Sequence, residues 1–405
     1  MLVILLKRNC GRRVTGARIM SGRNSAVGGV VSETRLTVIE MIEKVSLGTG
    51  SVVQAFEAAR GLAARGHQAI LVTRPDPVMA GRCQQSGVEH IAVPLRHELD
   101  LRSMRRLARI ATERGVDIVH VHKGIAHSVA LGATFLGGHF GLVVNRGVPF
   151  PLTRLNAPKY RSRRVDRVVV VCEFLKAIVV ASGRIAADKV AVVYAGVDLD
   201  RFDPARVTPS RVRTELGLAP GVPLVGVVGI RPEKGWTVVL DGFARVRHEV
   251  ADARLLLVGC HDEAVRREVE ARVAGAGLTG TVNVLLTRSD IPDVLAACAV
   301  VVDPSFAAGI TGTIREALAL EVPVVASRVG GNPELIEDGV TGLLVEPGDG
   351  AGFAAAITRM LVSPDEARSM ARCGRDRVRS GFSTVVRMDR LEGLYRQVAR
   401  EAQGR

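Results

Sequence analysis

The sequence predicts an α/β protein with two Rossmann-like parallel-sheet domains that face a central cleft. Three observations support this fold: apolar β-rich runs alternate with amphipathic helical stretches, one polar segment interrupts the alternation, and a second series follows it. Alternation with short loops favours parallel strands, because each crossover helix returns the chain to the same edge of the sheet. Ligands of such sheets bind beyond the carboxyl ends of the strands, so the residues directly after each strand are the candidates for function.

The first series starts at Leu36, and we place the N-terminal domain at residues 35–205. A helix is expected near residues 51–65. The strands are expected at LTVIEM, QAILVT, EHIAV, VDIVHV, GLVVN, DRVVVV and KVAVV. Residues 196–223 then break the pattern, because they are rich in Pro, Asp, Arg and Thr, which is typical of a connection between domains.

The second series predicts a C-terminal domain at residues 206–384. Its strands are expected at LVGVVG, RLLLVG, VNVLL, AVVVD, VPVVAS and TGLLV, each followed by a helical pattern. The length of 405 residues agrees with two or three domains of roughly 150 residues each.

The composition indicates a soluble, cytoplasmic protein, and we expect no cofactor and no metal ion. No apolar run approaches the ~18 to 20 residues that a membrane-spanning helix needs, and no secretory signal pattern is present. The 6 cysteines are scattered without a CxxC pair, which favours reduced thiols over disulfides or a zinc site.

The formal net charge of +14 limits the choice of partners. Residues 1–34 are strongly basic and are expected to be a disordered extension, or to follow from a start codon assigned too far upstream. Other basic residues cluster at residues 102–114 and 161–167, where they form either solvated surfaces or contacts with anionic lipid head groups or an anionic acceptor. Nucleic acid is not an expected partner, because aromatic residues make up only 3% of the chain.

Two glycine-bearing corners lie between residues 303 and 349. Gly309 to Gly312 and Gly330 to Gly331 each follow a short apolar strand and precede a predicted helix start. The N–H groups at a helix N-terminus are unpaired and carry partial positive charge, and glycine allows a phosphate to approach the main chain closely. This region therefore predicts a site for a phosphorylated ligand.

Two cations follow the strand at residues 224–229. Arg231 and Lys234 lie at the start of the helix that is expected to end near residue 249. Cations at this position oppose the helix dipole by about 0.3–1 kcal/mol each, and a bound diphosphate would explain them. Alternatively, both side chains reach into solvent or pair with Glu233.

Glu316 lies on the helix that is expected to begin near Thr313. One interpretation is structural, because Thr313 and Glu316 have the spacing of a capping box. The other is functional: the carboxylate binds sugar or ribose hydroxyl groups beside the phosphate site.

In the first half of the chain, Gly48 and Gly50 lie between a strand and a helix, where they can receive a phosphate or a sugar. Val53 replaces the third glycine of a dinucleotide fingerprint, which argues against a nicotinamide enzyme.

Polar residues also follow two later strands of the first half. His120, His122 and Lys123 lie at the end of one strand, and Asn145 and Arg146 end the next. Their position favours a role in the cleft, although a hydrogen-bonded structural histidine is an equal alternative for each histidine.

Five segments together resemble a known family: VIEMIEKVSLGTGSVVQAFEAARGLAARGH, VVYAGVDLDRF, VVGIRPEKGW, GITGTIREALALEVPVVAS and GGNPELIEDGVTGLLVEPGD. They resemble the retaining nucleotide-sugar glycosyltransferases of the GT-B fold, the glycogen-synthase-like group 1 family. The resemblance covers about residues 36–400. Within the family, the chain is most similar to bacterial members that build lipopolysaccharide cores and other surface glycans.

The resemblance implies roles for the candidate residues. Arg231 and Lys234 would bind the donor diphosphate and Glu316 the ribose, and with His122 they form the expected catalytic set. The expected donor-binding residues are Gly48, Gly50, Gly309, Ile310, Thr311, Gly312 and Thr313. The expected acceptor-side residues are Lys123, Asn145 and Arg146. The final helix, at residues 385–400, would cross back onto the N-terminal domain.

The chain departs from the family pattern at three places. One is the end of the strand VVNRG, where many relatives have a histidine or an arginine and Asn145-Arg146 fits only in part. The family commonly has a second glutamate that contacts the donor sugar, and Ala308 occupies that position here. Gly229 stands where an arginine is frequent, which leaves Arg231 as its substitute.

The implied activity is metal-independent transfer of a hexosyl or heptosyl group, with retention, from a nucleotide diphosphate sugar to a glycan or glycolipid acceptor. Anionic membrane on the inner face of the plasma membrane is a further expected partner. Two alternatives remain open: a nucleotide-sugar epimerase or phosphorylase on the same fold, and a non-catalytic nucleotide-sugar-binding subunit.

Overall fold

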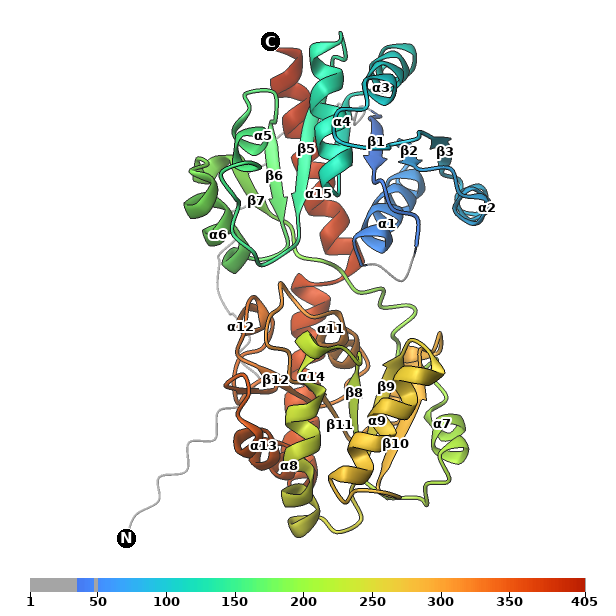
Figure 1. The fold of residues 1–405 in the computed structure, drawn as a ribbon, viewed down its shortest axis with the longest axis vertical. Coiled ribbons are helices and arrows are strands. Elements are labelled where there is room, and N and C mark those ends of the chain that lie inside the picture. The colour runs from blue at the N-terminus through green and yellow to red at the C-terminus, as the bar shows by residue number, and fades with distance from the viewer. Residues whose placement is uncertain (1–34, 47–49, 405) are drawn as a thin grey trace, which may run out of the picture. The chain divides into compact units, whose positions relative to one another are not determined.

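The computed structural model describes residues 35–46 and 50–404, which form two parallel β-sheets, each covered by helices (Figure 1). The predicted fold class, α/β with two Rossmann-like parallel-sheet domains, is therefore confirmed. The predicted extension at residues 1–34 lies outside the described residues, and so does Gly48.

The first sheet contains seven strands in the order β3-β2-β1-β4-β5-β6-β7. They are β1 (Thr37–Met41), β2 (Gln68–Thr73), β3 (Glu89–Ala92), β4 (Ile118–Val121), β5 (Gly141–Arg146), β6 (Arg167–Val170) and β7 (Val190–Val192). Strand order reverses between β1 and β4, where Ile39 lies opposite Val119. In open parallel sheets, ligands bind at such a switch point.

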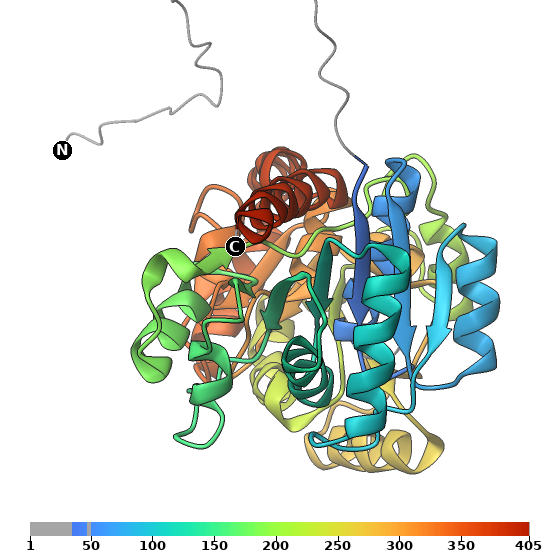
Figure 2. The ribbon, with the colours of Figure 1, turned by 90° about the horizontal axis from the view of Figure 1, so that it is seen from above.

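Helices cover both faces of this sheet, as Figure 2 shows from above. One face carries α1 (Gly50–Ala64), α2 (Pro77–Gln85) and α15 (Thr384–Gln403). The other carries α3 (Leu101–Arg114), α4 (Gly124–Phe135), α5 (Ala157–Arg161) and α6 (Glu173–Gly183), and the short 3-10 helix η1 (Ala187–Lys189) precedes β7. Because both faces are covered, neighbouring residues such as Val38 and Ile39 are both fully buried, and the strands are largely apolar on both sides.

The second sheet contains six strands in the order β10-β9-β8-β11-β12-β13. They are β8 (Leu224–Val228), β9 (Arg254–Cys260), β10 (Val282–Leu286), β11 (Val300–Asp303), β12 (Val324–Ser327) and β13 (Leu343–Val345). Here the order reverses between β8 and β11. The segments after these two strands are the cation-bearing loop and the first glycine corner.

Helices also cover both faces of the second sheet. One face carries α8 (Trp236–Glu249), α9 (Glu263–Gly275) and α13 (Gly350–Val362), and the other carries α10 (Ile291–Ala296), α11 (Gly312–Ala319) and α12 (Asn332–Leu335). The remaining helices are α7 (Pro209–Glu215), α14 (Pro364–Gly381) and the 3-10 helix η2 (Pro232–Lys234). None of the described helices combines the length and the apolar character that crossing a membrane requires.

The chain passes between the two sheets twice, and the two passages lie side by side. The N–H of Val197 donates to the carbonyl of Phe382, and the N–H of Thr384 donates to the carbonyl of Val197, both at 2.9 Å. A Cβ atom at Gly196 would come within 2.6 Å of the Thr384 Cα, so this close approach requires glycine. After the second passage, α15 packs on the first sheet and buries Tyr395 completely.

Candidate functional site

The first glycine corner leads into α11, which has an open N-terminus. Thr311 is the N-cap residue, and the helix begins at Gly312. The side chain of Thr311 forms no capping bond. Because Thr313 already lies in the first turn, the structural alternative for Glu316, a capping box with Thr313, is wrong. The N-terminal amides of α11 therefore have no side-chain cap.

Glu316 is left without a structural partner by this arrangement. Its carboxylate forms no hydrogen bond or ion pair among the described residues, and burial raises its pKa against the opposing charges of Arg315, Arg201 and Lys234. Since these charges act on Glu316, all three cations lie near it. Glu316 is therefore free to accept a hydrogen bond from a ligand.

Lys234 lies at the end of η2, directly before α8. Its Nζ atom is 3.4 Å from Oδ2 of Asp303, the last residue of β11, which is buried. Gly235 follows with φ of 63°, and a Cβ atom there would collide with the carbonyl of Pro304. The loop after β8 is thus fixed against the end of β11, which brings Lys234 to the same corner as α11.

Arg231 has a different environment. It is 63% exposed, and its Nε atom lies 3.2 Å from Glu233. This is the alternative pairing that the sequence allowed, and no other charged group within residues 35–46 and 50–404 pairs with Arg231. Its role toward a diphosphate stays a prediction.

The second glycine corner does not lead into an anion site of the predicted kind. The helix after Gly330 and Gly331, α12, has only four residues, which is too short for a substantial dipole. Instead, its Glu334 carboxylate accepts hydrogen bonds from the N–H groups of Glu173 and Phe174, both at 2.9 Å. This corner therefore caps α6 of the first domain.

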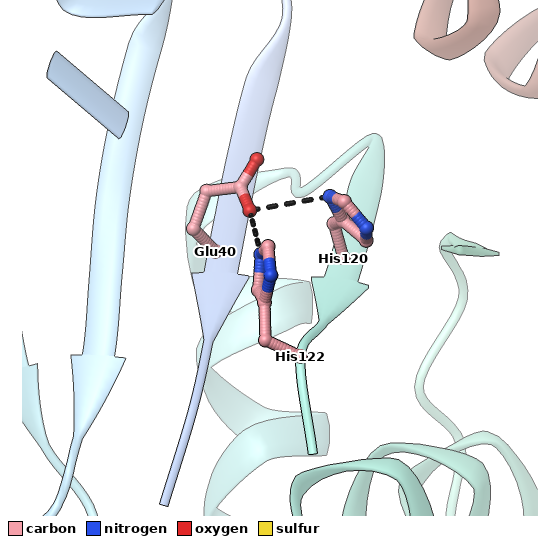
Figure 3. Close-up of side chains that lie close together, drawn as sticks. All are labelled: Glu40, His120 and His122. Atoms are coloured by element: carbon pink, nitrogen blue, oxygen red, sulfur yellow. Dashed lines mark hydrogen bonds and ion pairs between the residues drawn. The ribbon is translucent and has the colours of Figure 1, made fainter. Parts of the chain in front are cut away.

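In the first domain, His122 belongs to a buried network at the switch point between β1 and β4 (Figure 3). Its Nε2 atom lies 2.5 Å from Oε2 of Glu40, and the hydroxyl of Tyr395 donates to Oε1 of Glu40 at 2.7 Å. His120 joins through Nδ1, 2.7 Å from the Tyr395 oxygen. Although burial alone would raise the pKa of Glu40, its histidine partners hold it well below the usual range, so the carboxylate is ionised.

The network also determines the proton position on His122. Because burial and the nearby His120 lower the pKa of His122 to about 4, the ring is neutral near pH 7. Its Nε2–H donates to Glu40, and its Nδ1 accepts from the amide of Asn145 at 3.1 Å. Both ring nitrogens are thus occupied, so contact between His122 and a substrate requires one of these bonds to open.

Glu40, His120 and His122 also present three ligand atoms within 4.8 Å of one another, which raises the question of a metal ion. Ligand atoms around a tetrahedral zinc ion are separated by about 3.3 Å, from metal–ligand bonds of roughly 2.0–2.1 Å. The separation of 2.5 Å between His122 and Glu40 is shorter and is that of a hydrogen bond. The arrangement therefore fits a proton-sharing network better than a metal site.

The remaining candidates surround these groups. Lys123 is the N-cap residue of α4, and Gly50 is the first residue of α1. The guanidinium of Arg146 donates to the carbonyl of Phe150 at 2.8 Å. Near the second sheet, Gly309 contacts the first domain through its carbonyl, which lies 3.7 Å from Sγ of Cys172. The two domains thus touch beside the first glycine corner.

Sequence reasoning missed three buried groups near these sites: Glu40, Tyr395 and Arg315. For two of them, Glu40 and Arg315, the sequence contained a signal. Glu40 interrupts the apolar strand TVIEM, and Arg315 interrupts the apolar helix TIREALA. A charge inside an apolar run needs a partner, because burial of an unpaired charge is unfavourable. Tyr395 offered no such signal, since a tyrosine on an amphipathic helix is ordinary.

Comparisons with known protein families identify the chain. A model described as Glycosyl transferases group 1 matches residues 220–363, and one described as Glycosyltransferase Family 4 matches residues 48–201. The chain belongs to the group 1 glycosyltransferases. The two matched segments of the chain correspond to its two sheet domains.

The names of relatives of this glycosyltransferase describe different products. It is 26% identical over 375 residues to N-acetyl-alpha-D-glucosaminyl L-malate synthase of Bacillus anthracis, covering 87% of this chain and 95% of the relative. It is 25% identical over 310 residues to the UDP-Gal:alpha-D-GlcNAc-diphosphoundecaprenol alpha-1,3-galactosyltransferase of Escherichia coli. This match covers 73% of this chain and 79% of the relative.

Solved structures share the fold of this glycosyltransferase. A glycosyltransferase from Rickettsia africae superposes with a TM-score of 0.82 at 22% identity, covering 90% of this chain and 98% of that one. Anabaena HepE in complex with UDP gives a TM-score of 0.78 at 20% identity, covering 89% of this chain and 100% of that one. At these identities, the likeness supports the GT-B fold alone and assigns no substrate.

The pH dependence of stability is the first testable property of this glycosyltransferase. Burial and the nearby Lys159 lower the pKa of His127 to about 3, and that of His122 is about 4. The unfolded chain takes up these protons near pH 6.5, so the contribution of the two histidines to stability should be constant above that pH and fall below it. Each histidine should contribute up to about 1.4 kcal/mol per pH unit.

Urea denaturation between pH 7.5 and 4.5 measures this fall. His127→Phe keeps an aromatic ring at this buried position against Tyr160 but cannot take up a proton. It should therefore reduce the slope of the free energy of unfolding against pH by the equivalent of about one proton. A slope that is unchanged in the variant would contradict the assignment.

Proposed function

We propose that the chain transfers a sugar from a nucleotide diphosphate sugar to a hydroxyl group of a glycan or glycolipid, with retention at the anomeric carbon and without a metal ion. The observation that carries the proposal is the corner where β8 and β11 end. There, Lys234 approaches Asp303, Glu316 has no structural partner in the described part of the chain, and the side chain of Thr311 does not cap the N-terminus of α11.

The chemistry of this corner suits a diphosphate leaving group. Cleavage of the glycosyl–phosphate bond leaves negative charge on the diphosphate, and a preorganised cation and helix amides stabilise that charge in the transition state. Glu316, with its free carboxylate, accepts hydrogen bonds from the ribose hydroxyl groups beside it. UDP in the Anabaena structure supports a nucleotide ligand of this kind.

The acceptor is proposed from the relatives. The name of the Escherichia coli enzyme describes transfer to a sugar on diphosphoundecaprenol, which supports a lipid-linked acceptor and a role in cell-envelope glycan synthesis. We propose a hexosyl or heptosyl donor and include lipopolysaccharide among the candidate products.

Incubation with a panel of nucleotide sugars and acceptors, followed by mass spectrometry, tests this function. We expect a glycosylated acceptor and a nucleoside diphosphate, undiminished by EDTA, and proton NMR should show the anomeric configuration of the donor in the product. Sugar release or isomerisation without an acceptor product would favour a phosphorylase or an epimerase. Binding without turnover across the panel would favour a non-catalytic subunit.

We also propose that the first domain contacts anionic membrane through the start of α3. Arg102, Arg105 and Arg106 are exposed there and form no ion pair among the described residues, and the neighbouring Leu99 and Leu101 are 77% and 55% exposed. Basic side chains beside exposed apolar ones suit a surface of anionic lipid.

Sedimentation with phosphatidylglycerol vesicles should therefore capture the protein, and vesicles of phosphatidylcholine alone should not. Replacing the three arginines of α3 by glutamine should reduce capture about tenfold or more. The same replacement at Arg368, Arg372 and Arg379, exposed on α14, is the matched control. Equal loss in both triple variants would show that net charge, rather than α3, determines binding.

A further inference from the structure

Arg315 is a buried cation without a partner. It lies on α11 and is only 9% exposed, and its Nε and Nη1 atoms are inaccessible to solvent. Neither atom has a hydrogen-bond acceptor, and the guanidinium forms no ion pair among the described residues. A buried guanidinium in this state is strongly unfavourable unless something supplies an acceptor.

The guanidinium reaches back toward the open end of α11. Its Nη2 atom lies 3.8 Å from the position that a Cβ atom of Gly312 would take, and Oε1 of Glu316 lies 3.6 Å from the same position. Gly312 is the first residue of the helix. Arg315 thus adds a positive charge beside the helix amides, where the dipole already makes the potential positive.

The charges around this position do not balance. Burial lowers the pKa of Arg315 to about 10, and the positive charge of the buried Arg387 lowers it further. Among the described residues, Glu316 is the one acidic group that acts appreciably in the opposite direction. Lys234 and Arg201 add further positive charge near Glu316, whereas Asp303, the ion-pair partner of Lys234, adds one negative charge. The described residues therefore surround the start of α11 with an excess of positive charge.

We propose that Arg315 is a phosphate-binding residue that contacts the diphosphate of the nucleotide sugar together with Lys234 and the N-terminal amides of α11. This assignment rests on the proposed function and adds a residue to it. A diphosphate carries two to three negative charges, which matches several cations better than a single carboxylate would. Arginine also presents a planar fork that binds two phosphate oxygens at once.

An anionic group on the acceptor has the same chemistry and is the competing source of the anion. The two possible sources can be told apart, because each predicts that a different ligand loses affinity when Arg315 is replaced. If the anion is the diphosphate, nucleoside diphosphate and inorganic pyrophosphate both lose affinity in a variant, whereas the nucleoside does not. If the anion belongs to the acceptor, nucleotide affinity stays the same and the acceptor KM rises.

The experiment uses the full chain with Arg315→Met, which keeps the apolar stem, and Arg315→Lys, which keeps the charge but loses the fork. Arg272→Met is the control, because Arg272 lies exposed on α9. Isothermal titration calorimetry is performed with the nucleoside diphosphate that most stabilises the unchanged protein in a panel, with its nucleoside, and with pyrophosphate.

For Arg315→Met, we expect at least tenfold weaker binding of nucleoside diphosphate and pyrophosphate, unchanged nucleoside binding, and a higher melting temperature without ligand. The melting temperature should rise because an unpartnered buried charge has been removed. Arg315→Lys should show a smaller loss of affinity, and Arg272→Met should bind as the unchanged protein does.

Unchanged diphosphate affinity in Arg315→Met would overturn the assignment, and a raised acceptor KM in that case would identify the acceptor as the source of the anion. A lower melting temperature with equal losses for all ligands would also overturn it, because Arg315 would then be structural. Failure of the unchanged protein to bind any nucleoside diphosphate would instead overturn the proposed function and this assignment with it.

Discussion

Lys234→Ala is expected to abolish sugar transfer and to leave the fold intact. Loss of one preorganised group that stabilises developing charge typically reduces the rate by about 10²- to 10³-fold. The fold should survive because Asp303, the partner of Lys234, also accepts hydrogen bonds from the N–H of Ser305 and the hydroxyl of Thr311. Initial rates of nucleoside diphosphate release and circular dichroism spectra measure the two outcomes.

The matched control is Lys176→Ala, on α6, where the lysine forms no ion pair among the described residues. It should transfer sugar at the normal rate. Near-normal turnover in a folded Lys234→Ala protein would remove Lys234 from the mechanism and would leave Arg231 and Arg315 as the remaining candidates for the leaving-group site.

Glu40→Ala should have the largest effect on stability. The carboxylate accepts hydrogen bonds from Tyr395 and His122 in a fully buried position. Its removal leaves both donors without their acceptor and takes away the negative charge that lies 3.2 Å from His120. Breaking a buried charged network by removal of one member destabilises a protein by about 3–5 kcal/mol. Urea denaturation near pH 7 measures the free energy of unfolding.

Glu40→Gln separates charge from hydrogen bonding, because the amide keeps one acceptor oxygen, and it should destabilise less than the alanine variant. Glu268→Ala, exposed on α9, is the control for the loss of a carboxylate and should change stability by less than about 0.5 kcal/mol. A Glu40→Ala protein as stable as this control would show that the network contributes nothing to the fold.

The strands could be predicted because a sheet covered on both faces needs continuous apolar runs, and the strands from Thr37 to Val345 follow such runs closely. The corner that joins Lys234 to α11 was also predictable, since both segments directly follow strands. The first residue of a helix was harder to predict. Gly312 enters α11 one position before the expected Thr313, and this single position decides whether Glu316 caps the helix or stays free.

Long-range partners could not be predicted from one sequence. Glu40 and Tyr395 are separated by 355 positions, and only the return of α15 to the first sheet brings them together. The same holds for Glu334, whose carboxylate binds amides of α6 rather than any neighbour in sequence. No periodicity reports such contacts, because periodicity assigns a residue to a face and not to the element across it.

The return of α15 also dictates an order of events during synthesis on the ribosome. The first sheet and its other helices are made in the first half of the chain, yet the helix that covers one face of that sheet and supplies Tyr395 comes last. Every strand of the second domain leaves the ribosome before then. The domain synthesised first is therefore the domain completed last, and a chain that stops before Thr384 leaves its first half exposed however well its second half has folded.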